Sequence, residues 1–179
     1  MNTLEELSRE LPALARRAID AHLAGDHPIS AAREGAPAAG VFVTLREADG
    51  KLRGCIGSIT PAERDVFAET ARSAVLAATR DPRFSPVGRA ELAALSIEVS
   101  VLAPDEPVAG LRDLDPKRYG GIVCDHGGRR GLLLPDIEGV DDAETQVAIA
   151  RQKAGIAAGE PVRLSRFRVT KAKESSPAA

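Results

Sequence analysis

The sequence predicts an α+β fold with a largely antiparallel sheet and packed helices. Two pairs of strand-like segments are joined by glycine-containing turns, which indicates antiparallel hairpins. Other segments repeat apolar residues at three- and four-residue spacing, which is typical of amphipathic helices. The two kinds of segment do not follow the strict strand-helix-strand alternation of a doubly wound fold, so the class is α+β.

Composition narrows the classes of protein that this chain can represent. It has 179 residues, a net charge of -2 and 3% aromatic residues, which disfavours nucleic acid as a partner. The two cysteines have no CxxC spacing and follow no leader-like segment, so we expect reduced thiols in the cytoplasm. No apolar run approaches the roughly 20 residues that cross a bilayer, so we expect no membrane association.

The N-terminal segment predicts a helix, because apolar residues recur on one stripe from Leu4 to Ala18. Thr3 and Glu6 have the spacing of a capping box. Pro12 interrupts the pattern and predicts either a kink or a helix that starts near Leu11. The stripe ends near Gly25, and residues 26–40 are expected to form a loop.

Two strands and a helix follow the loop. Residues 41–46 and 51–59 form a predicted hairpin, with Asp49-Gly50 suited to a type I′ turn. Thr60 as N-cap and Pro61 at the first helical position predict a helix that runs to about Thr79. Residues 95–101 alternate apolar and polar side chains, which predicts a strand of the same sheet with one wet face.

The second half of the chain repeats this mixture. We expect a short helix around 111–117, a hairpin of 121–125 and 130–134, a helix at 142–156 and a strand at 162–170. Residues 1–172 would form one domain, with a smaller subdomain at about 104–139 and a groove between the two lobes. The tail at 173–179 lacks apolar content and is expected to be disordered.

The segment 52–57, LRGCIG, is where chemistry is expected. The strand period of two places Arg53, Cys55 and Gly57 on one face. A nearby cation favours a thiolate, so Cys55 is a candidate nucleophile or redox thiol and Arg53 the group that tunes it. Gly54 and Gly57 could admit a ligand close to the backbone. The alternative is that Cys55 is a small packed hydrophobe and that the glycines accommodate a helix.

Further candidates for anion recognition lie outside this segment. Asp81, Arg83 and Phe84 follow a helix in a proline-fixed loop, and an arginine held there suits a carboxylate or phosphate. The alternative is a rigid helix stop. Arg130, beside the second hairpin, is another such cation. No metal site is predicted, because the cysteines and the three histidines have no recurring ligand spacing.

Five runs occur in a characteristic order: LRGCIG at 52–57, RDPRF at 80–84, SIEVSVL at 96–102, RG at 130–131 leading to LP at 134–135, and RQKAG at 151–155. Together, over about residues 5–170, they resemble the AMMECR domain family, whose bacterial and archaeal members are called AmmeMemoRadiSam system protein A. Ser85 departs from the proline that is frequent in relatives. The resemblance implies two unequal subdomains, with LRGCIG close to the groove between them, and association with a Memo-like protein and a radical S-adenosylmethionine protein. It identifies neither a reaction nor a cofactor.

Two hypotheses about function stay open. The first is an accessory protein that binds a small anionic ligand or a peptide of a partner, and it is favoured because no complete acid-base set can be assembled. The second is an enzyme that uses Cys55 on a small anionic substrate. The candidate ligand-binding residues are Arg53, Gly54, Cys55, Gly57, Asp81, Arg83, Phe84 and Arg130.

Overall fold

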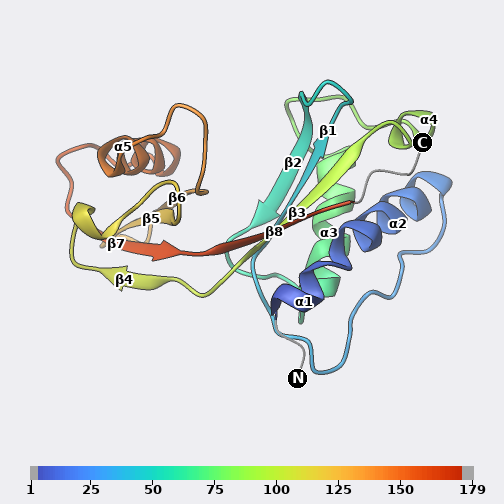
Figure 1. Ribbon diagram of the computed structural model, residues 1–179, viewed down its shortest axis with the longest axis horizontal. Helices are drawn as coiled ribbons and strands as arrows, with labels where there is room; N and C mark the ends of the chain where they lie inside the picture. The colour runs from blue at the N-terminus through green and yellow to red at the C-terminus, as the bar shows by residue number, and fades with distance from the viewer. Residues whose placement is uncertain (1–3, 175–179) are drawn as a thin grey trace. The chain divides into compact units, whose positions relative to one another are not determined.

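The computed structural model describes residues 4–174, which form two compact units. The first unit comprises the chain up to Leu102 together with the residues from Thr170 onward, and the second spans Ala103–Val169. Both contain antiparallel strands and packed helices (Figure 1), so the predicted α+β class is confirmed. Within residues 4–174, no helix is both long and apolar enough to cross a membrane.

The first unit is built on a four-stranded sheet. Its strands are β1 (Val41–Arg46), β2 (Leu52–Ser58), β3 (Ser96–Leu102) and β8 (Val169–Lys173), in the order β2-β1-β3-β8 (Figure 1). β1 is antiparallel to both β2 and β3, so the strand predicted from residues 95–101 joins the same sheet as expected. Thr44 pairs with Cys55 on one side and with Glu98 on the other. β2 is therefore an edge strand of this sheet.

Helices cover one face of that sheet. They are α1 (Leu4–Ser8), α2 (Leu11–Ala24), α3 (Val66–Thr79) and α4 (Arg89–Leu92). α3 packs on β1 and β2, α2 packs on β3, and the two helices pack against each other (Figure 1). The core between them contains fully buried residues of both layers, among them Leu11, Ile19, Val43, Leu45, Val66 and Val99.

The N-terminal helix is divided where proline predicted a disturbance. α1 ends at Ser8, and α2 begins at Leu11 with Pro12 in its first turn, where a missing backbone donor costs least. Gly25 ends α2 in a left-handed conformation with φ of 78°, which glycine adopts without steric cost. The predicted capping box depends on Thr3, which lies outside the described residues.

The β1–β2 turn differs from the predicted type I′ turn. Gly50 donates its backbone N–H to the carbonyl of Glu47 and has φ of 85°, whereas the only described non-glycine residue with a positive φ is Asp136. A type I′ turn needs two positive φ values, so Asp49 does not meet it. The hairpin closes instead with an ordinary turn followed by a left-handed glycine, and the register shifts between Leu45 and Arg46.

α3 begins at Val66 and not at Thr60. Asp65 is its N-cap and accepts the backbone N–H groups of Phe67 and Ala68. The backbone N–H groups of Ala62 and Glu63, which a longer helix would have placed in its first turn, donate to the fully buried carboxylate of Glu69. A side chain of the helix therefore binds the segment that precedes it.

The second unit contains another four-stranded sheet, in the order β4-β7-β5-β6. The strands are β4 (Glu106–Val108), β5 (Gly120–Asp125), β6 (Arg130–Leu133) and β7 (Val162–Phe167). A short 3₁₀ helix, η1 (Leu111–Asp113), precedes β5, and α5 (Ala143–Ala154) packs on β5 and β6 (Figure 1). Val123, Ala150 and Ile156 form a buried cluster between α5 and this sheet.

The second unit is longer than the expected subdomain at 104–139. It continues to Val169, because β7 pairs with β5 and α5 covers the same sheet. The single strand expected at 162–170 is two strands, β7 and β8, which belong to different sheets. Of the expected disordered tail, Lys173 ends β8 and Glu174 forms an ion pair with Arg16, while residues 175–179 lie outside the described part.

Candidate functional site

Cys55 lies in the middle of the edge strand β2, with a half-buried side chain. Its cross-strand neighbour is Thr44, and the Cys55 Sγ and Thr44 Oγ1 atoms are 3.4 Å apart. Gly57 shares its face of the strand. Arg53 is left unpaired at the register shift, where Leu45 pairs with Gly54 and Arg46 with Leu52, so its predicted place on the face of Cys55 stays a prediction. The thiol is therefore held beside a hydroxyl in the sheet and is not sealed in apolar packing.

Asp81 binds both the strand that carries Cys55 and the loop that carries Arg83. Its side chain is only 2% exposed. One carboxylate oxygen accepts the backbone N–H of Cys55 at 2.8 Å, and the other accepts the backbone N–H of Arg83 at 3.1 Å. The guanidinium of Arg83 donates from Nε at 2.9 Å and from Nη2 at 2.7 Å. A single carboxylate thus fixes the position of β2 relative to the loop.

The protonation of Asp81 reflects these contacts. Hydrogen bonding from Arg83 is the main cause that holds the pKa of the Asp81 carboxyl well below its usual range. Burial opposes this shift, while the backbone N–H groups of Cys55 and Arg83 lower the pKa further. Asp81 in turn holds the pKa of the Arg83 guanidinium above its ordinary value. The pair is ionised over the whole physiological range.

Arg83 keeps donor capacity for a further partner. Its side chain is 54% exposed, although Nη2 also lies 3.4 Å from the carbonyl oxygen of Cys55. Within residues 4–174 no hydrogen bond uses its Nη1. The ring of Phe84 lies 5.5 Å from the guanidinium carbon and borders it on one side. Arg83 therefore presents a fixed N–H group to solvent beside Cys55.

Arg53, the predicted partner of the thiol, is engaged elsewhere. Its guanidinium pairs with the carboxylate of Glu91 and donates from Nη1 to the carbonyl of Ser85 at 3.0 Å. This hydrogen bonding is the main cause that lowers the pKa of Glu91. Because Arg53 is nearly buried and its charge is compensated, it has less influence on Cys55 than an unpaired cation would have.

The fold leaves no room for a Cβ atom at either glycine of the LRGCIG segment. A Cβ atom on Gly54 would lie 2.4 Å from the carbonyl oxygen of Ala77 in α3, so a helix does pack across this position. A Cβ atom on Gly57 would lie 2.1 Å from the carbonyl oxygen of Val41 on the neighbouring strand. Both positions thus require glycine for backbone packing. A helix packs across Gly54, as the structural alternative proposed, whereas a neighbouring strand lies against Gly57.

Gly54→Ala is expected to lower the free energy of unfolding by about 1–3 kcal/mol, because the new methyl group must push β2 and α3 apart. Gly159→Ala is the matched control. Its Cβ would meet nothing within 4 Å, so its effect should stay within about 0.5 kcal/mol. Urea denaturation of both variants measures the difference. Equal stability of Gly54→Ala and the wild type would contradict the close helix packing.

Arg130 belongs to the second unit, where its Nη2 lies 3.2 Å from Asp105. The other candidate residues, Arg53 to Phe84, all belong to the first unit. In the part of the chain that the structure describes, no cluster of histidine, cysteine and acidic side chains could hold a metal ion.

Sequence reasoning missed three neighbours of the site. Thr44 could have been predicted, because the hairpin places β1 opposite Cys55. Glu91 and Ser85 had no local signal, since they reach Arg53 from 38 and 32 residues away. Asp81 was predicted as a candidate ligand-binding residue, but its contact with the Cys55 backbone could not be read from spacing.

Comparisons with known proteins agree with the resemblance noted in the sequence. The AMMECR1 family model matches residues 12–172. A protein of Thermotoga maritima is 51% identical over 136 residues, which cover 75% of this chain and 78% of that protein. A protein of Clostridium acetobutylicum is 47% identical over 137 residues, which cover 76% of this chain but only 28% of that longer protein.

A solved structure extends the likeness to the fold. The crystal structure of an uncharacterized protein from Pyrococcus horikoshii has a TM-score of 0.83 and 34% sequence identity to this chain. The similar region covers 96% of this chain and 93% of that one. With a family model that matches from within α2 to within β8, the chain belongs to the AMMECR1 family.

Proposed function

We propose that this protein is a cytoplasmic accessory protein that binds an anionic group at the edge of β2, where Cys55, Asp81 and Arg83 meet. The anionic group would be a carboxylate or phosphate, carried by a small ligand or by a peptide segment of a partner. The observation that supports this proposal is the Asp81 carboxylate, which holds the half-exposed Arg83 next to the backbone of Cys55, while no hydrogen bond among residues 4–174 uses Nη1.

Preorganisation of Arg83 by Asp81 favours anion binding. An arginine whose fork is already fixed loses little rotamer entropy when an anion arrives, so more of the interaction energy appears as affinity. Asp81 offsets much of the positive charge, which favours a ligand that is recognised by hydrogen-bond geometry over one attracted by net charge. The site would include Phe84 as a flat neighbour of the guanidinium.

The proposed partners come from the family resemblance. A Memo-like protein and a radical S-adenosylmethionine protein are associated with such chains, and either could present an acidic segment to Arg83. The predicted groove between two lobes, to which Arg130 would contribute, stays a prediction. Arg53 would support the site by holding the 85–91 segment in place through Ser85 and Glu91.

The enzyme hypothesis remains the second candidate, because the Cys55 thiol is half-buried and next to a hydroxyl. A nucleophilic cysteine needs a base, and none of the hydrogen bonds among residues 4–174 joins Cys55 to a histidine. The contacts therefore fit an accessory protein better, in which Cys55 contributes mainly by packing.

Cys55→Ala and Cys55→Ser distinguish the two hypotheses. Native mass spectrometry of each variant, mixed with the purified Memo-like or radical S-adenosylmethionine protein, measures the occupancy of the complex. An accessory protein should retain binding within about threefold in both variants, because neither removes Asp81 or Arg83. Loss of binding in both variants, together with rapid alkylation of Cys55 in the wild type, would instead support a thiol-dependent enzyme.

A further inference from the structure

A second thiol lies in the second unit, in a row of three side chains that crosses the sheet. Cys124 on β5 pairs in register with Arg130 on β6 and with Arg163 on β7. Residues that are directly opposite in adjacent strands point to the same face, with Cβ atoms about 5 Å apart. Two arginines therefore flank this thiol, one on each side. We call these residues the Arg130–Cys124–Arg163 row.

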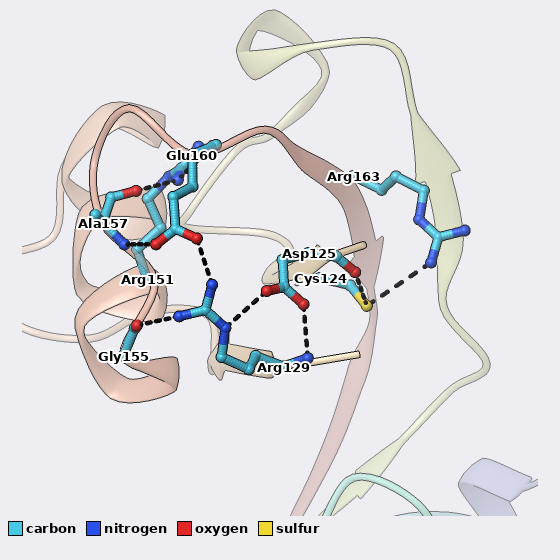
Figure 2. Close-up of polar contacts among 8 residues, drawn as sticks. All are labelled: Cys124, Asp125, Arg129, Arg151, Gly155, Ala157, Glu160 and Arg163. Carbon is cyan, nitrogen blue, oxygen red and sulfur yellow. Dashed lines mark hydrogen bonds and ion pairs between the residues drawn. The ribbon is translucent and has the colours of Figure 1, made fainter. Parts of the chain in front are cut away.

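The contacts of Arg163 mark the row as a candidate anion site. Its Nη2 lies 3.9 Å from the Cys124 sulfur (Figure 2), and within the described residues Arg163 forms no ion pair with a carboxylate. Arg163 is exposed, so its charge is available to a solute. Arg130 is partly compensated by Asp105 at 3.2 Å, with a third of its side chain exposed.

The nearest acidic cluster lies on the other face of the strand. Asp125 accepts both the backbone N–H and the Nε of Arg129 at 2.7 Å, and Arg129 also pairs with Glu160 (Figure 2). Both carboxylates therefore share one cation, Arg129, which does not belong to the row. The sulfur itself makes a weak contact of 3.5 Å with the carbonyl oxygen of Asp125.

The two cysteines of the chain differ in whether the arginines near them have carboxylate partners. Near Cys55, Arg53 is paired with Glu91 and Arg83 with Asp81, so each guanidinium has a carboxylate partner. Near Cys124, Arg163 has none among the described residues. The sequence predicted a thiol beside a cation at Cys55, whereas the thiol beside a guanidinium with no carboxylate partner among the described residues is Cys124.

We propose that the Arg130–Cys124–Arg163 row is a site of thiol-disulfide exchange with anionic low-molecular-weight disulfides of the glutathione disulfide class. The arginine forks would bind the carboxylates of the disulfide and place its sulfur next to Cys124. The Cys124 thiol loses its proton to solvent, and its sulfur bonds to one sulfur of the disulfide. The disulfide bond breaks, and the other half leaves as a thiolate. The product is a reversible mixed disulfide on Cys124.

The charge of the disulfide provides the test. In a Cys55→Ser background Cys124 is the sole thiol, and intact-mass spectrometry gives the rate of mixed-disulfide formation with glutathione disulfide, a dianion, or with cystamine, a dication. The ratio of the two rates in the folded protein is divided by the ratio in the urea-unfolded chain. We expect a corrected ratio of roughly ten or more in favour of glutathione disulfide, falling as salt is added.

Substitutions distinguish the effect of the row's own arginines on the corrected ratio from the effect of the protein's net charge. Arg163→Gln should lower the corrected ratio about threefold or more, and Arg130→Gln should lower it less because Asp105 already partners that arginine. Arg168→Gln is the control, because it removes the same charge at a position five residues along the chain. The proposal would be overturned by a corrected ratio near one in the wild type, or by a folded Cys124 that reacts with neither disulfide. It would also be overturned if Arg163→Gln left the ratio unchanged or changed it as much as Arg168→Gln does.

Discussion

Replacing Asp81 by asparagine is expected to lower the free energy of unfolding by roughly 2–4 kcal/mol at neutral pH. The side chain is almost completely buried and accepts hydrogen bonds from the backbone of Cys55 and from Arg83. Asparagine has nearly the same shape but removes the charge and presents N–H groups where acceptors are needed. Urea denaturation followed by circular dichroism measures this change.

Asp49→Asn serves as the matched control for Asp81→Asn. Asp49 also pairs with a cation, Lys51, but half of its side chain is exposed. Exposed ion pairs contribute about 0–1 kcal/mol, so this variant should unfold close to the wild type. Equal losses in the two variants would show that burial of the Asp81 carboxylate is not the cause.

The stability difference between the wild type and Asp81→Asn is expected to depend on pH. Because the pKa of Asp81 is lowered in the folded state, its ionised form stabilises the protein above the ordinary value of 3.8, and that contribution is lost as the pH falls below it. The stability advantage of the wild type over Asp81→Asn should therefore shrink between pH 6 and pH 2.5, by at most about 1.4 kcal/mol per pH unit. An advantage that stays constant over this range would contradict the assigned direction.

Local patterns were sufficient for much of the fold. Alternating apolar residues, glycine-containing turns and the Pro12 interruption placed the strands of both hairpins and the break between α1 and α2 close to their positions. These features depend on residues a few positions apart, which a sequence displays directly. The antiparallel α+β class follows from them.

Features that depend on distant residues were not predictable in this way. α3 begins later than expected because Asp65 is a better cap than Thr60 and because Glu69 reaches back to the backbone of Ala62 and Glu63. The strand expected at 162–170 divides because its two halves pair in different sheets. The periodicity of residues 162–170 does not indicate that the neighbouring strand changes within the segment.

The candidate site shows the same limit. The strand period predicted Arg53 and Cys55 on one face, but it could not show the register shift that leaves Arg53 unpaired. Nor could it show that Glu91 neutralises Arg53 or that Asp81 binds the Cys55 backbone. Those contacts join segments 26 and 38 residues apart. The cation next to LRGCIG that keeps an exposed donor is therefore Arg83, contributed by the loop after α3.

Arg83→Lys is expected to weaken binding of the anionic group roughly tenfold or more. Lysine keeps a cation beside the Asp81 carboxylate, so the fold should persist, but it cannot reproduce the fixed fork of a guanidinium. A hydrogen bond to a charged group contributes about 1.5–3 kcal/mol, which corresponds to roughly ten- to a hundredfold in affinity. Arg89→Lys is the control, because Arg89 is an exposed cation with only a loose 3.5 Å ion pair to Asp20.

Native mass spectrometry of the wild type and Arg83→Lys, alone and mixed with the Memo-like and radical S-adenosylmethionine proteins, tests the proposed site most directly. It detects a bound small anion and a bound partner in one spectrum. We expect an adduct of one of these kinds on the wild type and on Arg89→Lys, with much lower occupancy on Arg83→Lys. Equal occupancy on Arg83→Lys, or no adduct on the wild type, would contradict an anion-binding role for Arg83.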